Sequence, residues 1–186
     1  MNWSGLVSLS LRYMHLMEGA MEKVLFGCPN LECLELGHFG GFHHLEISNV
    51  KQTKLIIDNL ETDESDIWLE ISAPYIQNLQ LLGSCRGICL RNMASLVTTV
   101  LYFDFDFEDG DELMESGCLT ELLHSIAHVE NLELGPWCIE FLSILELEGW
   151  QSPPSCRKFV KLETALEQLD FPGICSFLQS YLILRH

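Results

Sequence analysis

The sequence is poor in basic residues. Ten Lys and Arg stand against 27 Asp and Glu, which gives the 186-residue chain a formal charge of −17. Proteins that bind the phosphate backbone of nucleic acids need clustered Lys and Arg on one surface. The composition therefore argues against nucleic acid as a direct partner. It is compatible with a chain that meets basic protein surfaces.

Long apolar runs are missing as well. No stretch approaches the roughly 18 uninterrupted apolar residues that a helix needs to cross a bilayer. Within residues 1–19, Arg12 is the single Lys or Arg and lies in the middle of the apolar part, and no small-residue cleavage site follows. We expect no membrane attachment and a cytoplasmic or nuclear protein.

The eight cysteines form no C-x-x-C pair. Zinc ribbons and thioredoxin-like redox sites use that spacing, so we expect reduced and largely buried thiols. His38, His43 and His44 lie near Cys33, but on a strand-loop-strand segment these side chains point to different faces. A closed zinc site needs four converging ligands, and we predict no metal site here.

Catalytic motifs are absent too. The chain has no G-x-S-x-G elbow, phosphate-binding loop or H-E-x-x-H helix. The acidic run 104–112 resembles a calcium loop, with Glu115 at the twelfth position, but the sixth position is Asp109 and not the glycine that the bend requires. We predict a solvated insertion loop, and a protein that is not an enzyme and uses no cofactor.

What the sequence does have is a repeat. Residues 31–36 show the L-x-x-L-x-L spacing that marks the inner strand of a leucine-rich repeat, directly after a Cys-Pro-Asn turn. A leucine-rich chain gives chance matches, but five of the six clear units fill all three strand positions with apolar residues; Gln52 marks the exception. The central position of each unit falls at Leu9, Leu34, Leu55, Leu79, Val100 and Leu132, with a degraded seventh unit at Leu162.

A second alternating pattern lies between the inner strands of the central units, at 43–48, 68–72 and 87–90. Period two is typical of strands, and nearby Gly and Pro oppose helices there. The fold class is therefore α/β, a leucine-rich-repeat-like solenoid with parallel inner strands and β structure on both faces of the central repeats. Short helices are expected toward the ends, at 18–26, 112–129, 139–146 and 172–181.

The outward positions of the inner strands form the candidate binding surface. Apolar residues among them would stand exposed on the concave face, which is a mark of a partner site. The alternative is that the 104–112 insertion or a missing segment covers them, and both remain open. The candidate residues are Arg12, Glu35, Ile56, Asp58, Gln80, Leu82, Leu101, Phe103 and Glu133.

Four segments, 27–32, 69–79, 92–97 and 170–174, resemble the leucine-rich region of plant F-box proteins of the F-box/FBD/LRR type. The resemblance covers most of the chain, from about Leu6 onward. It implies a domain that holds a target protein while an N-terminal F-box binds the Skp adaptor of a cullin ubiquitin ligase. No F-box or FBD module is recognised within residues 1–186, so Skp binding is not expected.

We therefore expect a single leucine-rich-repeat domain over 1–186, with about six or seven irregular repeats and truncated at both ends. The predicted function is non-catalytic protein binding, with a target protein on the concave face. The alternative is a truncated structural remnant or stand-alone repeat scaffold without a ligase role. Uncapped repeat ends would expose apolar surface, so end-to-end self-association is also expected.

Overall fold

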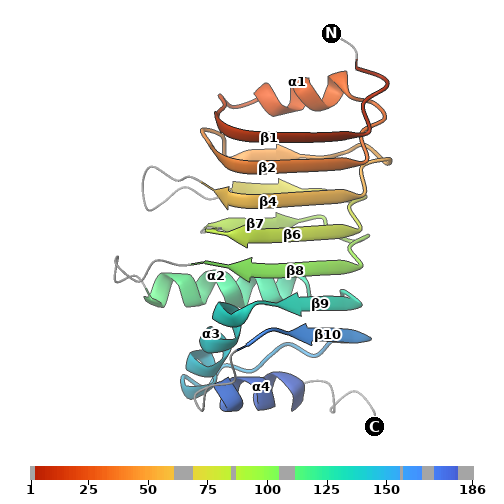
Figure 1. The fold of residues 1–186 in the computed structure, drawn as a ribbon. Coiled ribbons are helices and arrows are strands. Elements are labelled where there is room, and N and C mark those ends of the chain that lie inside the picture. Colours follow the sequence, from red (N-terminus) through yellow and green to blue (C-terminus); the bar gives the residue numbers. More distant parts are fainter. Residues whose placement is uncertain are drawn as a thin grey trace.

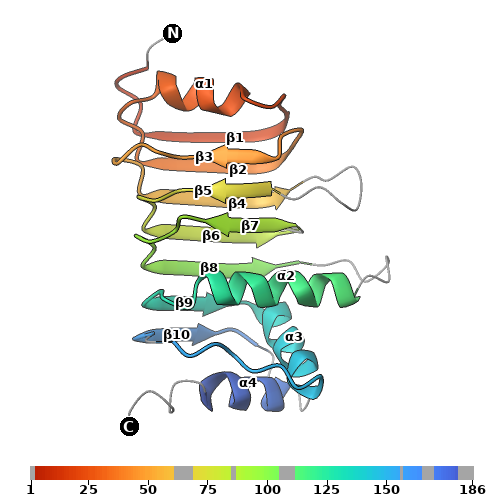
Figure 2. The same cartoon turned by 180° about the vertical axis from the view of Figure 1, so that it is seen from behind.

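A computed structural model describes residues 3–60, 69–84, 87–104, 112–155, 157–164 and 170–179. Seven parallel strands lie side by side in one sheet, and a second layer lies behind it (Figures 1 and 2). The sheet contains, in order, β1 (Ser8–His15), β2 (Cys33–Gly40), β4 (Lys54–Leu60), β6 (Asn78–Gly83), β8 (Thr98–Phe103), β9 (Asn131–Leu134) and β10 (Phe159–Leu162).

Each of these strands is followed along the chain by one element of the second layer. Its central members are three short strands, which pair in parallel as a second sheet. Helices replace them at both ends, so the expected mixture of second strands in the middle and helices outside it is confirmed. These elements are α1 (Ala20–Gly27), β3 (His44–Glu46), β5 (Leu69–Ser72), β7 (Ile88–Arg91), α2 (Glu112–Ser125), α3 (Pro136–Leu147) and α4 (Asp170–Gln179).

A tight turn precedes each strand of the large sheet from β2 to β9 and sets its register. In the first of these turns the Leu31 N–H donates to the Cys28 carbonyl over 3.1 Å, and Leu31 is fully buried. The same bond recurs between residues three apart before the following strands, for example from Gln52 to Asn49 and from Leu96 to Met93. One side chain per turn thus enters the interior just before the strand begins, and it is apolar in every such turn except that of Gln52.

Alternate strand residues then fill the space between the layers. Leu34 and Leu36 of β2 align with Leu55 and Ile57 of β4, and all four are fully buried. Residues of the second sheet, such as Leu45, meet them from behind. Burying a leucine contributes about 1.5–3 kcal/mol, so this stacked interior is the main source of stability.

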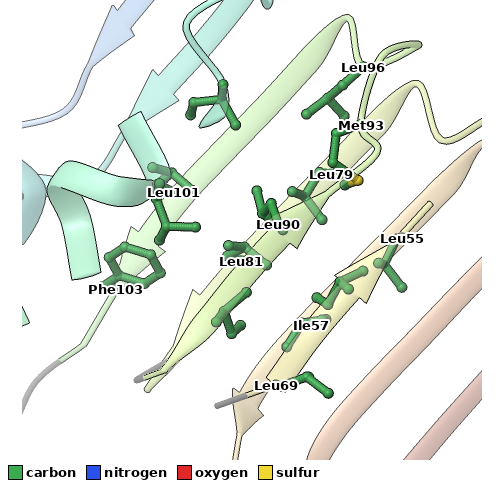
Figure 3. Packing of buried hydrophobic residues seen from close by; sticks show 14 of the residues in the cluster. Leu55, Ile57, Leu69, Leu79, Leu81, Leu90, Met93, Leu96, Leu101 and Phe103 are labelled. Atoms are coloured by element: carbon green, nitrogen blue, oxygen red, sulfur yellow. The ribbon is translucent and has the colours of Figure 1, made fainter. Parts of the chain in front are cut away.

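The fifth unit departs from the expected register by one residue. Val100 and Tyr102 were expected to point inward and Leu101 and Phe103 outward, but Leu101 is fully buried and Phe103 is 5% exposed. Figure 3 shows both side chains in the same interior as those of the neighbouring strands. Two of the predicted site residues, Leu101 and Phe103, are therefore core residues.

The turn before β8 explains this error. Leu96 and not Val97 enters the interior, with exposed fractions of 3% and 37%. The Val97 carbonyl accepts the N–H groups of Glu130 and Asn131, as the corresponding Glu32 carbonyl accepts those of Thr53 and Lys54 in the second unit. The central position of the unit is accordingly Thr99. In the seventh unit Val160, and not Leu162, aligns with Leu132.

A column of left-handed residues crosses four neighbouring strands. Tyr13, His38, Asn59 and Gly83 occupy equivalent positions, with φ angles between 47° and 66°. Such a residue interrupts the in-and-out alternation of its strand, so the side chain after it returns to the interior; Phe39 and Leu60 are buried in this way. Glycine and asparagine adopt this conformation readily. Tyr13 and His38 adopt it too, and their rings stack with centroids 4.7 Å apart.

No helix in the described part of the chain is long and apolar enough to cross a membrane.

Candidate protein-binding face

The outward face of the seven-stranded sheet is the side turned toward the viewer in Figure 1, with the second layer behind it. Strand alternation brings two rows of side chains to this face. The first row runs through Ser10, Glu35, Ile56, Gln80, Val100, Glu133 and Lys161, and the second through Arg12, Gly37, Asp58, Leu82, Tyr102, Gly135 and Glu163.

One end of the face carries an ion cluster around Arg12, called here the Arg12 cluster. The guanidinium donates two bonds to the Glu35 carboxylate, at 2.8 and 3.1 Å, and one to Asp58 at 2.9 Å. These partners, Glu35 first, raise the pKa of Arg12 above its ordinary value. Solvent screens exposed ion pairs strongly, so the cluster orients these side chains more than it stabilises the fold.

The other end carries a matching group, the Lys161 cluster. The Lys161 ammonium pairs with Glu133 at 2.6 Å and also with Glu163. The Tyr102 hydroxyl donates to Glu163 over 2.8 Å, which raises the pKa of Tyr102. Lys161 and then Tyr102 hold the pKa of Glu163 below its ordinary value, while Glu133 and Glu163 raise the pKa of Lys161. These shifts favour the charged forms of Lys161 and Glu163.

A glycine makes each of these long-range contacts possible. Gly37 lies between the strands of Arg12 and Asp58, and a Cβ added there would be 3.0 Å from Arg12 Cγ. Gly135 lies between Tyr102 and Glu163, and a Cβ there would be 2.9 Å from the tyrosine ring. Each side chain therefore lies across a glycine and bonds to the strand beyond it.

An uncharged region separates the two clusters and is called the central patch. Its members are three aliphatic residues, one amide and one aromatic residue. Tyr102 is 37% exposed, and the other members are half-buried. An apolar centre with a polar rim is the usual anatomy of a protein interface. The central patch consists of Ile56, Gln80, Leu82, Val100 and Tyr102.

The predicted site residues fall into three groups. Arg12, Glu35 and Asp58 come together as one cluster, while Ile56, Gln80, Leu82 and Glu133 also lie on this face. Leu101 and Phe103 do not, because of the register shift. Sequence reasoning missed Val100, Tyr102, Lys161 and Glu163. Val100 and Tyr102 could have been found from the sequence by assigning Leu96 as the turn residue of the fifth unit. Lys161 and Glu163 could be placed only with the alignment of β10 on β9.

The other side of the molecule is different in character. Outward residues of the second sheet are polar apart from Cys89, and Glu70 pairs with His44 at 3.4 Å and with Arg91 at 3.7 Å. The insertion 104–112, which was weighed as a cover for the candidate face, lies largely outside the described residues.

The described residues contain no group of three His, Cys, Asp or Glu residues able to hold a metal ion. Of the histidines near Cys33, for which no metal site was predicted, His38 stacks on Tyr13 while His44 lies on β3 beside Glu70. The Cys138 thiol is fully buried, and burial raises its pKa to about 12, which makes it a poor nucleophile.

Comparison with known proteins agrees with the sequence resemblance. A putative F-box/LRR-repeat protein of Arabidopsis thaliana is 31% identical over 175 residues, covering 89% of this chain and 37% of that protein. The chain is a relative of the plant F-box/LRR-repeat proteins. An F-box/LRR-repeat protein of the same plant is 30% identical over 96% of the chain and 39% of its own length. A probable F-box protein is 29% identical over 96% of the chain and 56% of its own length.

The chain thus spans roughly two fifths to just over half the length of these F-box/LRR relatives. No family model matches the sequence, and no solved structure matches the fold.

Proposed function

We propose that residues 1–186 form a single leucine-rich-repeat solenoid that binds a target protein through the outward face of its seven-stranded sheet. This role is non-catalytic and resembles that of the substrate-recognition region of an F-box subunit in a cullin-type ubiquitin ligase. The F-box/LRR relatives support this class of function. The central patch is the observation that carries the proposal.

The central patch combines exposed apolar surface with fixed geometry. Ile56, Leu82 and Val100 project from neighbouring strands of one continuous sheet, so their spacing is set by the backbone ladder. The Tyr102 ring lies across Gly135, and its hydroxyl donates to Glu163 on the far side of that glycine. Side chains that are already ordered lose little entropy on binding, and tyrosine is enriched among residues that dominate binding energy.

The polar second sheet does not offer such a surface. Its outward positions include Glu70, Ser72 and Arg91, which are charged or hydroxylated and engage one another or near neighbours. Of the two sheet faces, the face with the central patch is therefore the better candidate for a stable protein contact.

The proposal is tested by affinity purification from plant cell extract with three versions of the chain. Leu82→Asp places a charge in the central patch, whereas Ser72→Asp places the same residue type on the second sheet. We expect a set of proteins that wild type and Ser72→Asp retain and that Leu82→Asp loses, with similar thermal melts for all three.

Identical retained proteins for the three chains, or recovery of chaperones alone, would contradict the proposal. Recovery of an Skp adaptor and cullin would separate a ligase role from that of a stand-alone scaffold. The proposed location is the cytoplasm or nucleus, and imaging of a fluorescent fusion tests it.

A further inference from the structure

The two ion clusters have the same composition, one cation between two carboxylates. Arg12 forms ion pairs with Glu35 and Asp58, and Lys161 forms ion pairs with Glu133 and Glu163. Each cluster therefore retains one negative charge that its own cation does not neutralise. The four carboxylate side chains are 20–39% exposed, so a partner can still reach them.

The spacing between the clusters follows from the strand order. Glu35 lies on β2 and Glu133 on β9, four strand steps apart, and Asp58 and Glu163 are separated by the same number of steps. Strands lie about 4.8 Å apart, which places the two charges about 19 Å apart across the sheet. The apolar residues of the central patch lie between them.

The backbone of this face is already paired. Most of its strands have a hydrogen-bonded neighbour on both sides. A partner that lies on this face therefore meets side chains, because the backbone N–H and C=O groups are already bonded within the sheet. An extended segment laid flat on such a face would lose water from its own backbone groups without gaining new hydrogen bonds, which is costly. A helix has its backbone groups bonded internally and does not have this cost.

We infer that the central patch binds an amphipathic helix of the target that lies across the strands and places a basic residue at each ion cluster. At 1.5 Å per residue, about 19 Å corresponds to basic residues roughly 11 or 14 positions apart on one helix face, with an apolar stripe between them. A basic partner is also drawn to a chain of net charge −17. The inference rests on the proposed function and specifies its partner.

The test uses a displayed library of helices on a fixed helical scaffold, with randomised outward positions. It is selected on the full wild-type chain, and Leu82→Asp serves for counter-selection. We expect enriched clones with Lys or Arg about 11 or 14 positions apart around apolar residues. Their affinity should fall about tenfold or more for Leu82→Asp, because that carboxylate is buried against the apolar stripe.

Two further measurements examine the charges. Glu133→Gln should weaken the enriched clones about two- to fivefold and reduce the salt dependence of binding, in line with one exposed ion pair. The matched control Ser72→Asp should bind as wild type does. Enrichment of acidic or uncharged helices, or no clones that depend on Leu82, would overturn the inference.

This outcome can be told apart from failure of the proposed function. If extract proteins need Leu82 to bind but no basic helices are selected, the proposed binding face is supported and the helical partner is contradicted. If extract proteins bind all variants equally, both proposals are contradicted.

Discussion

The register of β8 gives the sharpest test of the fold, because two neighbouring apolar residues exchange roles between the two possible registers. Leu101 is fully buried, whereas Val100 is half-buried in the central patch. Truncating a fully buried leucine to alanine costs 2–5 kcal/mol, through lost burial and the cavity left behind. We expect Leu101→Ala to lower the free energy of unfolding by about 3 kcal/mol and Val100→Ala by less than about 1 kcal/mol.

Urea titration and thermal melts followed by circular dichroism measure both effects. For a chain of 186 residues, 1 kcal/mol corresponds to a shift in Tm of about 2–4 °C, so Leu101→Ala should lower the Tm by about 6–12 °C. Val100→Ala is the matched control, since it removes apolar atoms one residue away. A larger loss for Val100→Ala than for Leu101→Ala would mean that β8 has the other register.

Five further outcomes are expected. Leu79→Asp should unfold the central units at room temperature, whereas the outward Gln80→Ala should leave the melt nearly unchanged; equal melts would contradict the register of β6. Thr99→Val should raise the free energy of unfolding by about 1 kcal/mol in urea titration, because the buried Thr99 hydroxyl has no hydrogen-bond partner among the described residues. Glu163→Gln should lower the pKa of Tyr102 toward its ordinary value in an NMR titration, since the bond to the Glu163 carboxylate is the main cause of its rise. Because the pKa of Glu163 is lower in the folded chain, ionised Glu163 should stabilise the fold above the ordinary glutamate pKa of about 4.3, and this effect should be lost as the pH falls through the lower folded value. Thermal melts of wild type and Glu163→Gln across this pH range measure the difference. Finally, the isolated chain should self-associate through its ends, and light scattering that shows a 21.2 kDa particle at all concentrations and high salt would contradict this.

The sequence predicted the layered arrangement because the physical signals are local. Each inner strand alternates, as Leu34 and Leu36 do, and a turn with its own apolar residue precedes it. The second strands at the centre followed from the same alternation and from nearby glycines. The helix at the N-terminal end followed from Met21, Val24 and Leu25, whose three- and four-residue spacing forms one apolar stripe.

The prediction failed for the fifth unit because apolar residues there fit both possible registers of the strand. In residues 96–103 either Leu96 or Val97 fits the turn, and either choice gives a plausible strand. The correct choice leaves Thr99 in the core, a polar position that a pattern of apolar residues argues against. Tertiary packing decides here, since the opposite register would leave Leu101 and Phe103 in water.

Sequence patterns could not predict the two ion clusters, for a different reason. Arg12 and Asp58 belong to units that are not adjacent, and so do Tyr102 and Glu163. Their contact depends on the glycine of the strand between them. A single repeat contains no sign of this arrangement, which appears only when three neighbouring strands are aligned.

The glycine crossings have a consequence for how the units cooperate during unfolding. Stacked repeats are commonly treated as a one-dimensional Ising chain, in which each unit has an intrinsic free energy and couples only to its immediate neighbours. Here the first unit also couples to the third through Arg12 and Asp58, and the fifth to the seventh through Tyr102 and Glu163. Deleting the unit that contains Gly37 would remove two interfaces and would also place Arg12 directly beside Asp58, so that a contact between second neighbours becomes one between immediate neighbours. The order of the units is thus part of what the sequence encodes, and a statistical treatment of this chain needs a coupling term between second neighbours.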